Sequence, residues 1–448
     1  MKEALACAST LLKFIDQSPT AYQAVSNMRQ ILENQGFKSY QLNQDSKLKI
    51  GDRYYYTKND SAIIAFEIGQ NPLETGFKIF GAHTDSPSLR IKPKAISIKE
   101  EAIRLNTEVY GGAIYSTWFD RPLSLAGRVS LKGSSPLQVE SRFLDFKRPI
   151  LILPNVAIHM NRAVNSKNEI KANLHLLPIM GMVDSISEEE TENIKDNNKE
   201  YFWQNWFYQL LAKELEVKPE QILDFDLFTY DPTPGQIVGI NSDFITDSRL
   251  DNLAMCYAGL MAFLADKENE HFNGINLLIF TDNEEVGSRT KQGADSDFLR
   301  DLIESICINL GFSRQDFLSV FDHSYMISAD QAHAVHPNYS EYADPDHRPK
   351  INGGPVIKLA ASQSYATDSH SSAKFIGLCQ NANVPYQWFV NRSDLRGGST
   401  IGSITSSHLP MSTVDIGNAI WAMHSSRETA GVKDLVYLDK VLRTYFRL

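Results

Sequence analysis

The feature that most constrains this chain is an apolar run that ends at two adjacent glutamates. Leu277 to Phe280 is a short, uninterrupted apolar segment, which is typical of a buried strand in an α/β protein. Asn283, Glu284 and Glu285 follow it directly. Open α/β sheets place their ligand sites at the carboxyl ends of their strands. This stretch therefore predicts both an α/β fold and the position of the site.

The two glutamates repel each other, so keeping both ionised beside a buried strand requires a positive partner. A metal ion is the strongest such partner. One glutamate would then bind the metal while the other acts as a base. The alternative is a solvated turn with two surface acids, and this stretch alone does not decide between the two. The decision depends on whether other strand ends also carry ligands.

Length and composition indicate an ordinary globular protein. The 448 residues can bury a large core and predict two or three domains. A formal net charge of −10, with no basic run to offset it, disfavours nucleic acid and anionic membranes as partners. The four widely separated cysteines form no C-x-x-C pair, which indicates buried thiols in a reducing compartment.

The N-terminal segments predict two helices and not a signal sequence. Apolar residues before Asp16 fall on one helical face, and no segment approaches the roughly 20 apolar residues of a membrane span. We therefore expect a cytoplasmic protein. For the second helix, Ser18 is the expected N-cap, Pro19 the first helical residue, and Gly36 the end.

Two further strand ends carry possible metal ligands. The strand-like run Phe77 to Phe80 continues into a turn that holds His83 and Asp85. A His-x-Asp unit suits a metal-binding histidine whose other ring nitrogen is held by a carboxylate, although a lone histidine is more often a structural residue. Another run, Tyr325 to Ala329, ends at Asp330, and the loop after it is rich in histidine.

A loop with two aspartates leads into a helix that begins near residue 250. Asp247 and Asp251 are both candidate ligands there, and spacing alone cannot choose between them. Asp251 falls in the first turn of the helix, where a carboxylate is also favoured as a simple cap. Later in the chain Lys358 leaves an apolar strand, and His424 lies in a polar segment.

Residues 94–236 differ in texture from the rest of the chain. Short strand-like runs alternate there with Gly, Pro and Ser turns, which predicts a β-rich module inserted between the catalytic segments 1–93 and 237–448. His159, within the module, is unremarkable on spacing alone. One helix of the module carries large side chains that favour packing or an interface over a cofactor site, namely Trp203, Trp206, Phe207, Leu210 and Leu211.

Oxygen and nitrogen ligands thus lie near the ends of separate apolar segments: His83, Asp251 (or Asp247), Glu285, Asp330 and His424. This set suits two zinc ions that share a carboxylate, and it suits cobalt or manganese nearly as well. Glu284 remains as the general base. Two metals about 3.5–4 Å apart can polarise a carbonyl and activate a shared water, while the glutamate moves its proton to the leaving amine. We found no G-x-S-x-G, Walker or dinucleotide-binding motif, so hydrolysis by activated water is the remaining hypothesis.

Six segments, in order and across nearly the whole chain, resemble the M18 family of metalloaminopeptidases, whose best-known members are aspartyl aminopeptidases. They are GAHTDSPSLRIKP, SRLDNL, TDNEEVGS, DQAHAVHPNY, GGPVIK and AMHSSRE. The resemblance implies a mixed-sheet di-zinc domain flanked by helices, with an inserted β-rich dimerisation domain. It implies that Asp251 bridges the metals, in preference to Asp247, that Glu284 is the general base, and that Asp85 orients the first histidine. The implied metal ligands are His83, Asp251, Glu285, Asp330 and His424.

The resemblance also implies substrate contacts from His159, His333, Lys358 and Tyr365, with His159 reaching the active site of a neighbouring subunit. Members of the family assemble into tetrahedral dodecamers with the inserted domain at subunit contacts. We therefore expect a homo-oligomer that admits peptides with a free amino terminus and excludes folded proteins.

The substrate range is less constrained than the reaction. Lys358 could pair with an acidic amino-terminal side chain, or it could neutralise the carboxylate-rich site. Some members of the family prefer neutral or hydrophobic residues, and Arg396 adds a charge to an otherwise family-like glycine-rich loop. Two alternatives to an aminopeptidase are a di-zinc deacylase and a non-catalytic scaffold of the same fold.

Overall fold

The computed structural model describes residues 1–42, 47–186, 199–265, 272–395 and 397–448. Contacts between residues divide the chain into two compact units. Unit 1 consists of Met1–Ser86, Pro234–Met423 and Arg427–Leu448. Unit 2 consists of Pro87–Thr233 and the short segment His424–Ser426. The sequence between the two long segments of unit 1 is therefore an insertion with contacts of its own.

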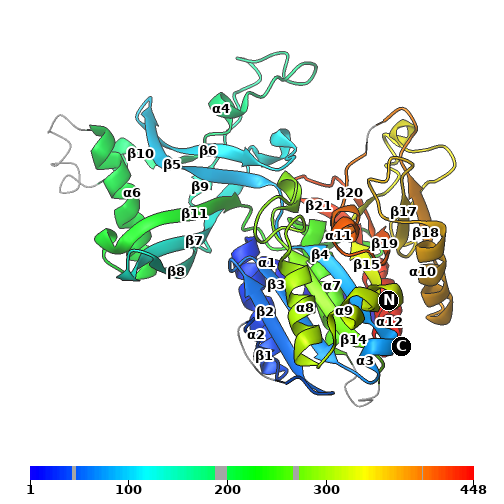
Figure 1. The fold of residues 1–448 in the computed structure, drawn as a ribbon. Coiled ribbons are helices and arrows are strands. Elements are labelled where there is room, and N and C mark those ends of the chain that lie inside the picture. The colour runs from blue at the N-terminus through cyan, green and yellow to red at the C-terminus, as the bar shows by residue number, and fades with distance from the viewer. Residues whose placement is uncertain (43–46, 187–198, 266–271, 396) are drawn as a thin grey trace. The chain divides into compact units, whose positions relative to one another are not determined.

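The centre of unit 1 is a nine-stranded mixed sheet with the order β1-β2-β3-β14-β4-β15-β19-β17-β18 (Figure 1). Strands β14, β4, β15 and β19 run parallel to one another, so their carboxyl ends meet at one edge. The strands of this sheet are β1 (Lys38–Ser39), β2 (Arg53–Lys58), β3 (Ala62–Ile68), β4 (Phe77–His83), β14 (Ile275–Thr281), β15 (Tyr325–Ala329), β17 (Val356–Leu359), β18 (Gln387–Val390) and β19 (Ser412–Gly417).

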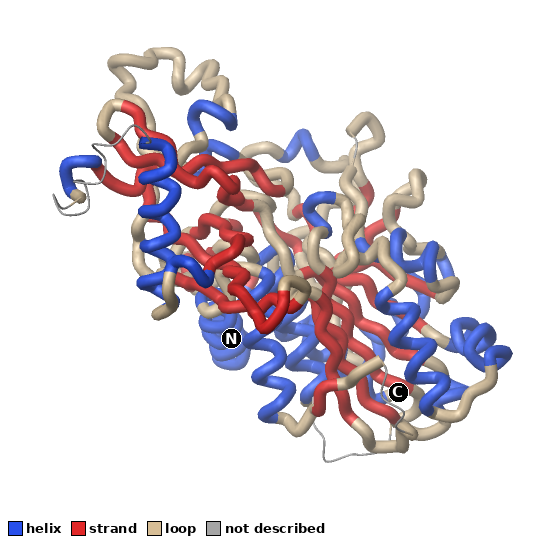
Figure 2. The backbone as a smooth tube through the Cα atoms, turned by 60° about the vertical axis from the view of Figure 1, so that its left-hand side comes forward, coloured by secondary structure: helices blue, strands red, loops and turns tan. Residues whose placement is uncertain are grey.

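Helices cover both faces of this sheet, which is why every residue of the central strands β4, β14 and β15 is buried. In β14, Leu278 and Phe280 pack into one core, and Leu277 and Ile279 pack into the core on the other face. Figure 2 shows these strands between helices. The first core includes helices α1 (Lys2–Asp16), α2 (Ala21–Asn34), α7 (Leu250–Leu264), α10 (Ser369–Asn381) and α12 (Val432–Arg447), and the second includes α8 (Phe298–Asn309), α9 (Arg314–Ser319) and α11 (Ile401–His408).

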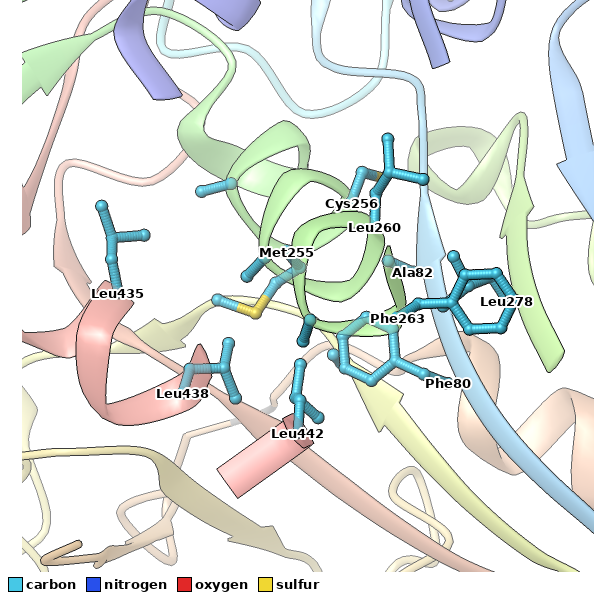
Figure 3. Packing of buried hydrophobic residues seen from close by; sticks show 14 of the residues in the cluster. Phe80, Ala82, Met255, Cys256, Leu260, Phe263, Leu278, Leu435, Leu438 and Leu442 are labelled. Carbon is cyan, nitrogen blue, oxygen red and sulfur yellow. The ribbon is translucent and has the colours of Figure 1, made fainter. Parts of the chain in front are cut away.

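Helix α7 lies close against the sheet and carries a candidate ligand at its start. Figure 3 shows side chains of α7 between Phe80 of β4 and the leucines of α12. A Cβ atom at Gly259 would collide with the ring of Phe80, so a residue without a side chain is needed for this approach. Burying a side chain as large as that of Phe80 stabilises the fold by about 1.5–3 kcal/mol. The packing fixes where α7 begins relative to the ends of the strands.

The start of the second helix differs from the prediction. The helix begins at Ala21 with Thr20 as its N-cap, so the assignment of Ser18 as N-cap and Pro19 as the first helical residue is wrong. Ser18 is buried, and its hydroxyl oxygen lies 3.0 Å from Asn27 Nδ2, which donates to it. The serine therefore links the preceding turn to α2 through a side chain, and does not cap the helix.

A smaller five-stranded sheet completes unit 1, with the order β12-β13-β21-β20-β16. Two of its strands, β12 and β13, precede α7 in the sequence, and two others, β20 and β21, precede α12. Its strands are β12 (Gln236–Val238), β13 (Phe244–Asp247), β16 (Ala332–His333), β20 (Ala419–Trp421) and β21 (Glu428–Gly431). A short helix, α3 (Pro72–Thr75), precedes β4.

Unit 2 is a β-rich module, as the sequence predicts. Strand β11 pairs with both β5 and β7, so the seven-stranded sheet closes on itself. Helix α6 (Lys199–Leu215) contributes Trp203, Phe207 and Leu211 to the core of the unit, so its aromatic stripe is used for packing. The other elements are β5 (Ser88–Lys99), β6 (Ala102–Tyr110), β7 (Pro122–Ser135), β8 (Gln138–Asp145), β9 (Leu151–Ile152), α4 (Ala172–His175), β10 (Ile179–Met182) and β11 (Ile222–Tyr230).

None of the helices in the described parts of the chain combines the length and hydropathy that a bilayer crossing would need.

Candidate metal centre

His83 is the last residue of β4, and three aspartates surround its buried ring. Its Nδ1 lies 3.4 Å from Asp85 Oδ1, and its Nε2 lies 3.6 Å from Oδ1 of Asp251 and 3.6 Å from Oδ1 of Asp330. Nδ1 also lies 3.1 Å from the main-chain oxygen of Asp85. A proton on Nδ1 would be donated there, and Nε2 would then present its lone pair to a cation beside Asp251 and Asp330.

The parallel pairing of the central strands brings these residues together. Thr281, the last residue of β14, is aligned with His83, and Asp330 follows directly after β15. Beyond β14 the chain turns through Asn283, whose φ of 62° is left-handed, into a 3₁₀ turn at Glu284–Val286. The residues that the sequence placed at separate strand ends thus lie together at one edge of the sheet.

Asp85 connects the histidine to the two glutamates. Its Oδ1 accepts the main-chain N–H of Glu284 at 3.1 Å, and its Oδ2 accepts the N–H of Glu285 at 3.1 Å. The first turn of the 3₁₀ segment has N–H groups without intrahelical partners, and a carboxylate is well suited to them. One buried carboxylate therefore fixes the position of the His83 ring and of both glutamate backbones.

Asp251 is held from both sides at the start of α7. Its N–H donates to Glu428 Oε2 at 2.8 Å, and its carbonyl oxygen accepts the hydroxyl of Ser86 at 2.7 Å. Its φ of −83° and ψ of 106° are not helical, so the chain departs from helix geometry where the carboxylate is presented. The reasoning from sequence missed Glu428, although this residue ends the AMHSSRE segment.

The group around His83 holds more negative than positive charge. The ligand atoms of His83, Glu284 and Glu285 lie within 4.8 Å of one another, and so do those of His83, Asp251 and Asp330. Burial and the neighbouring aspartates raise the pKa of Glu284 to about 8, and burial together with Asp251 raises the pKa of Glu285 well above its usual value. Such shifts show how costly it is to ionise these acids together without a cation.

The pKa of His83 reflects the same excess of acid. Burial acts to lower it, but the three aspartates around the ring raise it well above the ordinary histidine value. A second buried acid, Asp282, precedes the turn, and burial together with the charge of Asp85 raises its pKa to about 7. Imidazole and carboxylate donors, largely removed from water and in excess over local cations, fit a zinc ion.

Asp247, the rival of Asp251, has a different environment. It ends β13, is almost fully buried, and accepts the N–H of Ser248 at 2.8 Å. Burial raises its pKa to about 7. Among the described residues, the ligand groups that contain His83 include Asp251 and not Asp247.

Lys358 and Tyr365 lie together beside Asp330. The Lys358 ammonium is buried, 3.2 Å from Asp330 Oδ2 and 5.5 Å from the centroid of the Tyr365 ring. Burial is the largest single influence and acts to lower the pKa of Lys358, but Asp330, Tyr365, Asp415 and Asp251 together outweigh it, and the pKa is raised. His333 is exposed at the end of β16, with its ring 5.8 Å from that of Phe389.

The other two predicted histidines belong to unit 2. His424 has a left-handed φ of 68°, and its Nδ1 lies 3.2 Å from the carbonyl oxygen of Gly112. A ring N–H donated to a carbonyl is the usual arrangement in a metal-binding histidine, so this contact is compatible with the predicted role. His159 is exposed in a turn of the same unit. Arg396 lies outside the described residues.

Comparison with known proteins identifies the family. The sequence model of the Aminopeptidase I zinc metalloprotease (M18) family matches residues 14–446. The chain belongs to the M18 family. A probable M18 family aminopeptidase 2 of Clostridium novyi (strain NT) is 46% identical to this M18 chain over 450 residues, which cover 100% of each.

Solved structures agree with the assignment. A chain in the cryo-EM structure of the Ape4 and Nbr1 complex matches with a TM-score of 0.94 and 36% identity, covering 99% of this M18 chain and 86% of that chain. The S. cerevisiae mApe1 dodecamer matches with a TM-score of 0.82 and 25% identity, covering 98% and 96%. The predicted family, the fold class and the assignment as an M18 zinc aminopeptidase are confirmed.

Proposed function

We propose that this M18 aminopeptidase removes amino-terminal residues from peptides with two zinc ions held by His83, Asp251, Glu285, Asp330 and His424. Asp251 would be shared by the two ions, and cobalt or manganese could replace zinc. The observation that carries the proposal is the buried excess of carboxylates around His83, where an imidazole and several acids lie within bonding reach of a common centre.

We propose Glu284 as the general base. Zinc, when bound, polarises a substrate carbonyl and lowers the pKa of a coordinated water. Glu284 would take the proton of the attacking water and deliver it to the departing amine. Burial and the neighbouring acids raise its pKa to about 8, and a bound cation would lower it, so the group would be able to accept the proton. Asp85 supports this role because it holds the backbone of Glu284.

The side of the site that faces the substrate would include Lys358, Tyr365 and His333, together with His159 contributed by a neighbouring subunit. We propose a preference for amino-terminal Asp or Glu, with Lys358 as the counter-charge. The substrate carboxylate would then share the ammonium with Asp330, which lies 3.2 Å from it. The alternative is a preference for neutral or hydrophobic residues, with Lys358 serving only to neutralise Asp330.

We also propose a homo-oligomer, in which residues 94–236 form an inserted oligomerisation domain. The support is the structural likeness to the S. cerevisiae mApe1 dodecamer, and a tetrahedral dodecamer is the specific form proposed here. Such an assembly would admit peptides and exclude folded proteins. The cysteines are free, and three of them are buried, which supports a reducing compartment such as the cytoplasm.

A series of anilide substrates tests the proposed activity. We expect kcat/KM to be higher for Asp- and Glu-anilides than for Leu- and Ala-anilides, and we expect N-acetyl-Asp-anilide to be inert because an aminopeptidase needs the free amine. Faster turnover of the leucine substrate would show that the enzyme prefers neutral amino-terminal residues. Cleavage of acylated substrates would favour the deacylase, and no turnover of any substrate by the zinc-loaded protein would favour the scaffold.

A further inference from the structure

Asp415 is a buried acid that connects three segments beside Lys358. It lies in β19 with 0% of its surface exposed. Its Oδ2 accepts the N–H of Ala366 at 2.6 Å, and its Oδ1 accepts the hydroxyl of Thr400 at 2.6 Å. Its own N–H donates to the hydroxyl of Thr367 at 2.9 Å. Both its backbone and its carboxylate therefore hold the loop that begins at Tyr365.

The contact with Thr400 fixes the start of helix α11. Thr400 is the N-cap of this helix, yet its hydroxyl donates to Asp415 and makes no capping bond to the helix backbone. A Cβ atom at Gly402 would collide with the Asp415 carboxylate, so the acid is seated against the first helical turn. A carboxylate at this end of a helix is electrostatically favoured. The glycine-rich loop before Thr400 is thereby anchored at its end.

The same carboxylate acts on Lys358. Strands β17 and β19 are antiparallel, with Val356 aligned to Gly417 and Ile357 to Ile416, so the next step of this register brings Lys358 beside Asp415. Asp415 is among the negative charges that raise the pKa of Lys358, after Asp330 and Tyr365. One buried ammonium thus faces two carboxylates.

We propose that Asp415 is a positioning residue that sets which amino-terminal side chain the site accepts. It would do so in two ways, by anchoring the Tyr365 and Thr400 segments and by offsetting part of the positive charge of Lys358. The inference rests on the proposed function, in which Lys358 and Tyr365 face the substrate. An acidic substrate side chain would be drawn to Lys358 less strongly while Asp415 is present.

The two contributions are separable by substitution. Asp415→Asn removes the charge but keeps an oxygen for the N–H of Ala366, and its amide can donate to the Thr400 oxygen. Asp415→Ala removes charge and anchor together. The matched control is Asp434→Asn, because Asp434 is also fully buried and accepts two main-chain N–H groups, those of Asn352 at 2.6 Å and Gly354 at 2.9 Å.

The measurement is the ratio of kcat/KM for an Asp-anilide to that for a Leu-anilide with zinc-loaded enzyme. This ratio does not depend on the fraction of folded enzyme, because both substrates report on the same active molecules. For Asp415→Asn we expect the ratio to rise about 5-fold, as removal of one nearby negative charge predicts, mainly through a lower KM for the acidic substrate. For Asp434→Asn we expect the wild-type ratio.

For Asp415→Ala we expect kcat/KM to fall by up to about 100-fold for both substrates, because displaced loops misplace the substrate. Recovery of most of this loss in Asp415→Asn supports the anchoring role. An unchanged ratio in Asp415→Asn, or an equal change in Asp434→Asn, would overturn the inference. Failure of the proposed function would look different, because wild-type enzyme would then cleave neither anilide.

Discussion

Asp330 lies between two regions of the site that balance charge in opposite ways. Its Oδ1 lies 3.6 Å from His83, in an acid-rich region formed by His83, Asp85, Asp251, Glu284 and Glu285. Its Oδ2 lies 3.2 Å from Lys358, in a lysine region formed by Lys358, Tyr365, Thr400 and Asp415. In the lysine region the buried charges meet opposite charges or hydrogen-bond donors. In the acid-rich region they meet mainly other acids.

The difference shows which part of the site depends on an added cation. Burying an ionised acid costs several kcal/mol unless a counter-charge or good donors compensate. Lys358 and the donors around Asp415 supply that compensation from within the chain. In the proposed function, zinc supplies that compensation to the acids around His83. The two regions should therefore respond very differently when metal, charge or proton concentration is changed.

Removing metal should have the largest effect, because it acts on the acid-rich region alone. We expect dialysis against a chelator to reduce aminopeptidase activity to background and to lower the thermal midpoint, since a ligand bound only to the folded state stabilises it. Adding zinc back should restore both. The control is the same chelator saturated with zinc. Full activity in protein shown to be metal-free would contradict the assignment of the region.

Glu284→Gln should come next in size. We expect kcat to fall about 1000-fold, within the range of general acid–base catalysis, while zinc content and the thermal midpoint stay near wild type. The side chain keeps its shape, and the N–H contact with Asp85 is made by the backbone. Glu74→Gln, at an exposed helix position, is the matched control. Near-normal turnover in Glu284→Gln would mean that another group moves the proton.

The acid-rich region could be predicted well from the sequence, because its chemistry follows local rules. Apolar runs marked the strands, and parallel pairing placed the residues after them at one edge, so His83, Glu285 and Asp330 came together as expected. Spacing could not separate Asp247 from Asp251, since the first lies just before α7 and the second in its first turn. That choice depends on where α7 is packed against the sheet.

The supporting acids could not be predicted, because their partners are distant in sequence. Glu428 accepts the N–H of Asp251 across 177 positions, and no local pattern marks such a pair. Asp415 lies inside β19 between the buried residues Val414 and Ile416, and no motif in the sequence marks it as a site residue. Its role depends on Thr400 and Ala366, which reach it from separate loops. Residues that hold others in place are visible only once the chain is folded.

A pair of buried lysines sharpens the comparison. Lys358→Met removes the ammonium that lies 3.2 Å from Asp330, so among the described residues this acid keeps only the other acids and His83 as charged neighbours. We expect kcat/KM to fall about 10- to 100-fold, because Asp330 is displaced. We also expect a lower thermal midpoint. Lys78→Met is the control, because Lys78 is also buried but has its pKa lowered by burial to about 8. The Lys78 ammonium donates to the carbonyl oxygen of Phe446 at 3.4 Å, and this oxygen also accepts the side-chain amide of Asn276 at 2.9 Å, so it keeps a partner in the variant.

For Lys78→Met we expect unchanged kinetics and an equal or higher thermal midpoint, because an apolar residue avoids the cost of burying a charge. Steady-state kinetics and thermal unfolding of the two variants give the comparison. If both variants lost activity to the same extent, replacing any buried lysine of this sheet would reduce activity. The loss in Lys358→Met could then not be attributed to its ion pair with Asp330.

The smallest effect should come from Asp434, a buried acid whose carboxylate accepts the main-chain N–H groups of Asn352 and Gly354 and whose nearby cation is Lys433. Burial raises its pKa to about 7, whereas an unfolded aspartate titrates near pH ~3.9. Between these values the folded protein holds a proton that the unfolded chain has lost. The stabilising contribution of this group is therefore full below about pH 4 and is lost as the pH rises through 7.

We expect the wild-type thermal midpoint to fall more between pH 5 and 7.5 than that of Asp434→Asn, by about 2–4 °C, with equal kinetics for both proteins. Asp247, whose pKa is also raised to about 7 by burial, keeps part of the pH dependence in the variant. Equal slopes in the two proteins would contradict the raised pKa of Asp434. If Asp434→Asn changed the ratio of kcat/KM for the Asp- and Leu-anilides, any buried acid would affect selectivity. The proposed special role of Asp415 beside Lys358 would then be wrong.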